Sequence, residues 1–135
     1  MGVLDLAFAM LFWYGRVPPI RILQSIAAGL LGRKESVAGG LGTAVLGGAL
    51  HFAIATAMAF TYALVARRWP VLIRRASVLG AGYGLLLYAV MNFVVLPLSA
   101  VGMPAFTNHA WVASGIAVHV VFGVIFAHAA RLALR

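Results

Sequence analysis

The sequence predicts an all-α membrane protein, a polytopic bundle of transmembrane helices, and two observations lead to that class. Hydrophobic residues make up 64% of the 135 residues and charged residues only 9%, whereas soluble domains usually carry about 25% charged residues. A small domain cannot bury so much apolar surface within itself. The apolar residues also fall into long runs bounded by Arg and Lys, which is typical of membrane-spanning helices.

Four apolar runs predict four spans within a single domain of residues 1–135. A span needs about 20 apolar residues to cross roughly 30 Å. The first run would give only about 21 Å of helix, so it must borrow Arg16 and Val17, thin the bilayer or start outside it. Asn108 is a good N-cap for the last span. The expected spans cover residues 2–16, 38–66, 76–96 and 109–131.

Between the first two spans, residues 18–32 predict a short amphipathic helix. Pro18 and Pro19 suit a helix start, where a missing N–H costs nothing, and Gly32 suits its end. Arg21, Gln24 and the following Ser form a narrow polar stripe at i, i+3 and i+4 on an otherwise apolar helix. The segment is too short to span, so it either lies in the membrane interface or re-enters the membrane.

The chain carries ten Lys and Arg against two acids, for a formal net charge of +8. These bases lie between the apolar runs, so we interpret them as topology signals and contacts to anionic lipid. No base-reading motif accompanies them, so no nucleic-acid partner is expected. With four spans, one side holds Arg67, Arg68, Arg74, Arg75, Arg131 and Arg135, and the other holds Arg16, Arg21, Arg33 and Lys34. This imbalance favours cytoplasmic location of both termini.

Lines of small residues run along three of the predicted spans. In lipid, helices associate by close packing, and small residues spaced four apart let backbones approach each other. Such lines either pack the bundle internally or face another membrane protein chain, including a second copy. The helix-packing candidates are Gly40, Ala44 and Gly48, then Gly80 and Gly84, then Gly115 and Gly123.

Polar side chains within apolar spans predict a polar pocket. His51 and His119 lie near the middle of their spans, and such groups usually face the bundle interior with a partner. They serve either as interhelical hydrogen bonds or as a ligand or proton site. Both histidines meet only the depth requirement of a haem site, so we expect no cofactor, and the two acids are placed for neither metal binding nor catalysis. The candidate pocket residues are Arg21, Gln24, His51, Asn92 and His119.

Three motifs carry a resemblance to a known group: the run from Val17 to Gly32, the Leu50-His51-Phe52 triplet, and the run from Tyr88 to Ser99. In these the chain resembles small bacterial inner-membrane proteins of the YagU-like type, over most of its length. The resemblance implies a four-span protein of the bacterial cytoplasmic (inner) membrane. That group brings no activity, so no catalytic role is carried over to any residue.

These observations predict a non-catalytic integral membrane protein, an accessory or structural subunit that packs against other membrane proteins and lipids. The alternative is a small-solute or proton pathway lined by His51, Asn92 and His119. A third interpretation is a membrane enzyme that acts on lipids, with a histidine as base.

Overall fold

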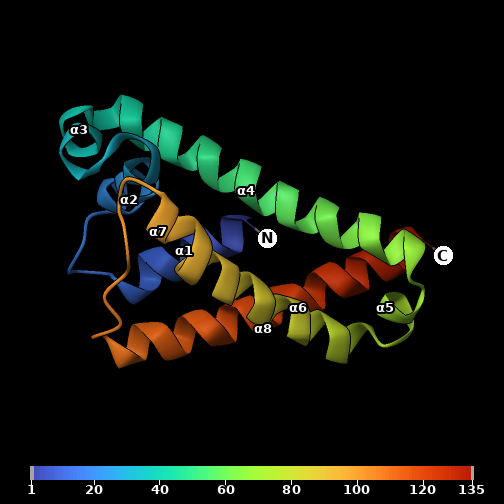
Figure 1. Cartoon of the computed structure of the whole chain (residues 1–135). Coiled ribbons are helices and arrows are strands. Elements are labelled where there is room, and N and C mark those ends of the chain that lie inside the picture. Colours follow the sequence, from blue (N-terminus) through green and yellow to red (C-terminus); the bar gives the residue numbers. More distant parts are fainter. Residues whose placement is uncertain (1, 135) are drawn as a thin grey trace. The chain divides into compact units, whose positions relative to one another are not determined.

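The computed structural model describes residues 2–134, which form helices, turns and loops without a strand (Figure 1). The predicted all-α class is therefore confirmed for this range. Arg135, one of the predicted cytoplasmic bases, lies outside it. In chain order the elements are α1 Gly2–Phe12, α2 Pro19–Leu31, α3 Arg33–Ala38, α4 Gly40–Arg68, α5 Val71–Arg74, α6 Ala76–Val90, the π-helix η1 Met91–Val95, α7 Leu96–Leu98 and α8 His109–Ala133.

Three helical segments are long and apolar enough to cross a membrane: Gly40–Arg68, Ala76–Leu98 and His109–Ala133. They indicate a membrane protein. The helix α1 has 11 residues, which at 1.5 Å per residue amounts to about 16 Å. The amphipathic helix expected at residues 18–32 corresponds to α2, which has 13 residues and is also too short to span.

The helix ends follow from local chemistry that the sequence displays. Pro18 and Pro19 begin α2, where a backbone N–H has no helical partner to lose. Gly32 ends α2 with a φ of 85°, a conformation that side chains with a Cβ disfavour. The Asn108 Oδ1 accepts a hydrogen bond of 3.0 Å from the Trp111 N–H at the start of α8. All three predicted helix boundaries are confirmed.

A π-helical turn, η1, joins α6 to α7 inside the third apolar segment. Pro97 explains it: a proline has no N–H, and its ring crowds the carbonyl four residues earlier, at Phe93. A wider π-turn relieves that conflict and lets the helix continue. The segment therefore reaches Leu98, whereas the apolar run alone indicated an end near residue 96.

The chain forms two compact units, and the first comprises Met1–Thr56 and Phe93–Pro104. Here the chain reverses at Gly32, so that α3 packs against α2, and the Ser36 hydroxyl donates to the Gln24 carbonyl. The Ala100 N–H donates to the Gly29 carbonyl over 2.9 Å, which attaches the loop after α7 to α2. These long-range bonds hold the amphipathic helix in a defined place within its unit.

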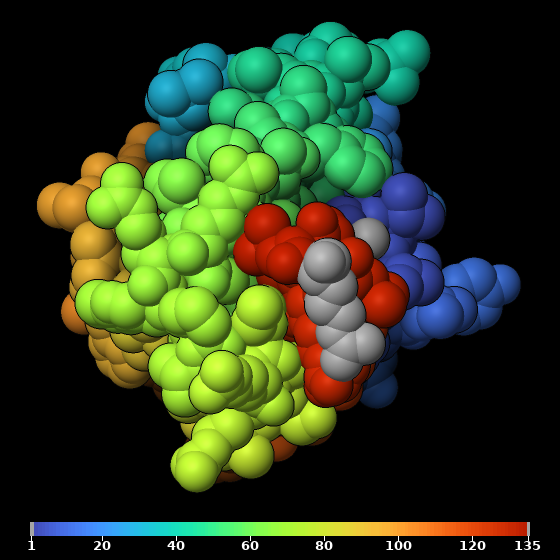
Figure 2. Space-filling view, turned by 90° about the vertical axis from the view of Figure 1, so that its right-hand side faces the viewer, coloured from blue at the N-terminus to red at the C-terminus, as the bar shows by residue number. Residues whose placement is uncertain are grey.

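The second unit comprises Ala57–Asn92 and Ala105–Arg135. In it α6 and α8 lie side by side (Figure 1). Small and aromatic side chains build its core, namely Tyr62, Ala66, Ala76, Ala127 and Ala130. Figure 2 faces the end of this unit, where α5 and the last turns of α4, green to yellow-green, lie beside the red end of α8. Arg67 and Arg68 end α4, Arg74 ends α5, and Arg75 follows it before α6 begins.

Two tyrosines link α4 to the rest of the second unit. The Tyr83 hydroxyl donates to the Met58 carbonyl over 2.7 Å, and the Tyr62 hydroxyl donates to the Leu72 carbonyl over 3.1 Å. Their rings meet edge to face with centroids 5.0 Å apart, a favourable aromatic geometry. A buried phenol needs such a partner for its hydroxyl, so these contacts fix the register of α4 within the unit.

Candidate functional site

The closest helix–helix contact in the second unit joins α6 to α8 through glycines. A methyl group at Gly80 would lie 2.7 Å from the Gly123 carbonyl oxygen, and one at Gly84 would collide with the His119 carbonyl. Gly115 lies further along, where a methyl group would be 3.2 Å from the Tyr88 ring. As residue numbers rise along α6, the contacted residue numbers fall along α8. The two helices are therefore antiparallel, and their backbones touch. Here the predicted small-residue lines pack the chain against itself.

The predicted line Gly40, Ala44 and Gly48 on α4 has mixed surroundings in the first unit. Ala44 is buried, whereas a methyl group at Gly40 would meet nothing within 4 Å and one at Gly48 would only touch the Leu23 side chain at 3.9 Å. The close approach is made by Gly47, because a methyl group there would collide with the Leu23 carbonyl of α2. The four-residue pattern predicts Gly48 for this contact, which is the residue next to Gly47.

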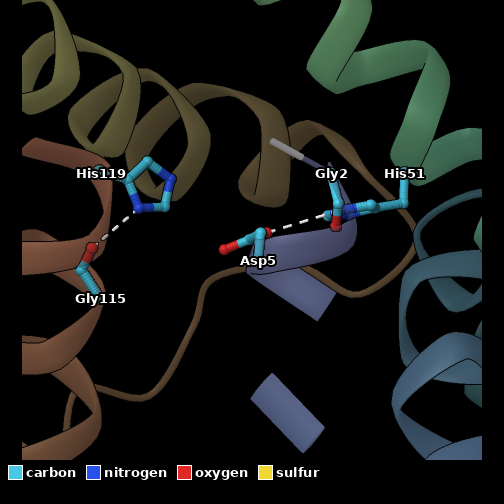
Figure 3. Close-up of polar contacts among 5 residues, drawn as sticks. All are labelled: Gly2, Asp5, His51, Gly115 and His119. Carbon is cyan, nitrogen blue, oxygen red and sulfur yellow. Dashed lines mark hydrogen bonds and ion pairs between the residues drawn. The ribbon is translucent and has the colours of Figure 1, made fainter. Parts of the chain in front are cut away.

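The His119 side chain lies between two elements of the second unit. Its Nδ1 lies 2.8 Å from the Gly115 carbonyl of the same helix (Figure 3), and a carbonyl can only accept, so Nδ1 carries a proton. The imidazole also meets the Tyr88 ring of α6 edge to face, with centroids 5.4 Å apart. The histidine is therefore both hydrogen-bonded within α8 and packed against α6.

Asn92, at the start of the π-turn, is bonded within its own segment. Its Nδ2 donates to the Tyr88 carbonyl over 2.9 Å. Tyr88 therefore contacts both predicted pocket residues of this unit, through its carbonyl to Asn92 and through its ring to His119. This shared neighbour is what brings the two residues into one part of the unit.

His51, on α4 in the first unit, faces the start of α1. Its Nε2 lies 3.0 Å from the Gly2 carbonyl oxygen and 3.7 Å from Asp5 Oδ2 (Figure 3). Its side chain is 14% exposed and that of Asp5 is 35% exposed. The imidazole thus lies next to both a backbone carbonyl and a carboxylate. Asp5 is not one of the five candidate pocket residues.

Arg21 and Gln24, the remaining predicted pocket residues, line a cavity of about 300 Å³ in the first unit. The other lining residues are Ser25, Ala28, Arg33, Val37 and Val101. The Gln24 Nε2 donates to the Gly40 carbonyl over 2.9 Å. His51 does not line this cavity and instead faces α1. The five predicted residues are thus found as three groups, two in the first unit and one in the second.

Metal binding requires several ligand side chains around one point. Between residues 2 and 134, no group of three or more His, Asp or Glu side chains is placed to hold an ion. His51 and His119, considered above as haem ligands, belong to different units. Each already has a carbonyl next to one ring nitrogen.

Residues that the pattern did not predict complete these groups. Arg33, Val37 and Val101 come from α3 and from the loop after α7, and only the tertiary fold brings them to α2. The signal that could have indicated Arg33 is its position just beyond Gly32, since a chain reversal there returns α3 toward the polar stripe of α2.

Comparison with known proteins gives no further identification, since no protein-family model, curated protein or solved structure matches the chain.

Proposed function

We propose that this chain is a non-catalytic integral membrane protein, an accessory or structural subunit that packs against other membrane proteins and lipids. The observation that carries the proposal is the large apolar surface of the three long helices. In their most apolar stretches only 11%, 11% and 17% of the residues are buried. Large side chains such as Leu41, Val45 and Phe60 are exposed. Water would make this surface very costly, so lipid tails or other apolar helices must cover it.

The polar groups of the spans support a structural role. Within the second unit, His119 and Asn92 hydrogen-bond to carbonyls of their own segments. Ser114 on α8 bonds the Ala110 carbonyl over 2.7 Å in the same way. Bonds of this kind pair one polar atom of each side chain inside lipid.

Two glycines favour contact with another chain. A methyl group at Gly42 on α4 or at Gly82 on α6 would meet nothing within 4 Å. Gly82 lies in the interior of α6, where glycine costs about 1 kcal/mol relative to alanine, and Gly42 lies in the first turn of α4. A contact that needs a small residue offsets such a cost. No such contact is made with residues 2–134, and a neighbouring helix in the membrane is a suitable partner.

The proposal includes a location and an orientation. We place the chain in the bacterial cytoplasmic membrane, as its resemblance to YagU-like proteins implies, with the arginines between α4 and α6 in the cytoplasm. The α1 helix provides a fourth span. Because α1 is short, the bilayer is thinned around it, and the turns after Phe12 complete the crossing. Both termini are then cytoplasmic, in agreement with the larger number of bases on that side.

Purification from native membranes tests the proposal. The tagged chain, extracted in a mild detergent, should co-purify stoichiometrically with one or a few larger membrane proteins and with lipid. Gly42→Leu should reduce that co-purification while the helix content stays unchanged. Recovery of the chain as a homo-oligomer that conducts protons or solute in liposomes would contradict the proposal, and so would lipid turnover by the purified chain.

A second candidate function is a proton or small-solute pathway, and the arrangement around His51 favours it. The His51 imidazole lies 3.7 Å from the Asp5 carboxylate, so two ionisable side chains stand next to each other within the first unit. Ionisable groups inside apolar segments often belong to proton relays. Proton flux across liposomes that contain only this chain is the measurement that separates the two candidates.

A further inference from the structure

The cavity of the first unit combines two cations with apolar walls. Arg21 on α2 and Arg33 on α3 both line it, one on each side of the reversal at Gly32. Ala28, Val37 and Val101 supply the apolar lining, and the volume is about 300 Å³. This size and this mixture of charged and apolar walls are typical of a small-ligand site.

The two arginines have no acid to neutralise them within the described chain. The one ion pair among residues 2–134 is that of His51 with Asp5, and the cavity lining contains no Asp or Glu. Glu35 belongs to the same short helix as Arg33 but does not line the cavity. Two unpaired guanidinium groups at one cavity can both donate hydrogen bonds to a single oxyanion such as phosphate.

Two of the lining residues carry hydrogen-bond acceptors. Gln24 is only 3% exposed, and its Oε1 is the one buried side-chain atom in residues 2–134 without a hydrogen-bond partner. An unpaired buried acceptor destabilises a fold, so a turn of the Gln24 amide that brings Oε1 to a ligand donor in the cavity would be favourable. The Ser25 hydroxyl donates to the Ile22 carbonyl over 2.6 Å, which leaves its oxygen as a second acceptor. The preferred ligand therefore carries an N–H or O–H donor beside its anionic group.

The frame around these groups is built by backbone contacts, so the arrangement is preorganised. Gln24 is held from both ends: its carbonyl accepts from Ser36 on α3, and its Nε2 donates to the Gly40 carbonyl. Thr43 on α4 donates to the Ser36 carbonyl over 2.5 Å. The bond from Ala100 to the Gly29 carbonyl holds the loop that carries Val101. A preorganised cavity binds with less loss of conformational freedom.

We propose that this cavity binds the headgroup of a glycerophospholipid. The phosphodiester lies between Arg21 and Arg33, and an ethanolamine ammonium or a glycerol hydroxyl donates to Gln24 Oε1 and Ser25. The apolar side chains Ala28, Val37 and Val101 contact the glycerol end of the acyl chains. Phospholipid headgroups are present on both faces of a membrane, and guanidinium groups bind their phosphates through paired hydrogen bonds. The proposal uses one unit only and does not depend on the orientation in the membrane or on an accessory role.

Lipid titration followed by native mass spectrometry tests the site. The purified chain is titrated with dihexanoyl phosphatidylethanolamine, and the Arg21→Gln/Arg33→Gln double variant should bind it at least tenfold more weakly. The matched control, Arg16→Gln/Lys34→Gln, removes the same charge from the same unit outside the cavity and should bind as the parent does. Val101→Phe fills the cavity without a charge change and should also weaken binding tenfold.

The choice of probe identifies the ligand. Phosphatidylcholine, whose ammonium has no N–H, should bind at least threefold more weakly than phosphatidylethanolamine. Inorganic phosphate at 10 mM should displace less than half of the bound lipid. Full displacement would assign the site to free phosphate and overturn the proposal. Equal losses of binding in the cavity and control double variants would show that only general surface charge matters, which would overturn the proposal. Unchanged binding in both the Arg21→Gln/Arg33→Gln and the Val101→Phe variants would overturn it as well.

Discussion

Gly80 lies so close to Gly123 that a methyl group on it would be 2.7 Å from the Gly123 carbonyl oxygen. Carbon and oxygen atoms do not approach to that distance without a shift of the backbone. The two helices therefore owe their spacing to the absence of side chains at these positions. In lipid, where the hydrophobic effect does not drive helices together, such close packing is a main source of association.

Replacing Gly84 with leucine should unfold this contact. The first side-chain carbon would collide with the His119 carbonyl, and overpacking of this kind costs typically 1–3 kcal/mol. We expect a loss of at least about 2 kcal/mol in the free energy of unfolding, measured by SDS titration in mixed micelles. Gly82→Leu is the matched control, because Gly82 faces open space on the same helix. Equal stability of the two variants would contradict the α6–α8 contact.

The first unit allows an equally sharp comparison on α4. Gly47→Ala would push its methyl group into the Leu23 carbonyl of α2, whereas Gly42→Ala would meet nothing within 4 Å. Alanine favours a helix over glycine by about 1 kcal/mol. Gly42→Ala should therefore stabilise the isolated chain by up to that amount, and Gly47→Ala should destabilise it. Stabilisation by both changes would show that α2 does not contact Gly47.

Local signals in this sequence predict local structure well. Pro18 and Pro19, Gly32 and Asn108 mark helix boundaries because each acts through its own backbone or through a group three residues away. The long apolar runs predict the three long helices because the length and hydropathy of a run are also local properties of the sequence. The π-turn is different, because Pro97 forces an irregularity but the sequence does not say whether the helix will break or widen.

Long-range geometry was harder to predict. A four-residue spacing selects Gly40, Ala44 and Gly48, but which face of α4 meets α2 depends on the crossing of the two helices, and the structure selects Gly47. The sequence places Arg21 and Gln24 on one stripe of α2, because the spacing of residues within a single helix determines which of them share a face. Arg33 and Val101 join them through a chain reversal and a loop contact, which no periodic pattern contains.

The proposed orientation predicts the result of reporter fusions. A fusion at Arg68 should report the cytoplasm and one at Gly102 the periplasm, because α6 to α7 crosses between them. A tag before Gly2 should be cytoplasmic if α1 makes the fourth crossing. A periplasmic tag there would leave three crossings, and an external signal at Arg68 would reverse the whole orientation. An Arg67→Glu/Arg68→Glu variant tests the cause, since loss of these bases should weaken the preference.

The mid-span histidines distinguish the structural role from the proton pathway. Glutamine retains a donor and an acceptor but cannot titrate near neutral pH. In His51→Gln the new amide can still donate to the Gly2 carbonyl, and in His119→Gln it can still donate to Gly115, although the ring contact with Tyr88 is lost. We therefore expect near-normal assembly in native membranes, with a loss of about 1 kcal/mol or less per histidine.

The matching flux measurement decides between the two functions. Parent and variants, reconstituted in liposomes under a pH gradient, should all show no proton flux above that of empty liposomes. Asp5→Asn is the control for the His51 site, because it removes the carboxylate 3.7 Å from the imidazole and keeps the imidazole in place. Flux in the parent that disappears in His51→Gln and Asp5→Asn, with assembly intact, would establish a proton pathway through the first unit. Loss of assembly without any flux would identify the histidines as hydrogen-bonding struts, since a strut fails when its geometry changes and a proton carrier fails when its titration is removed.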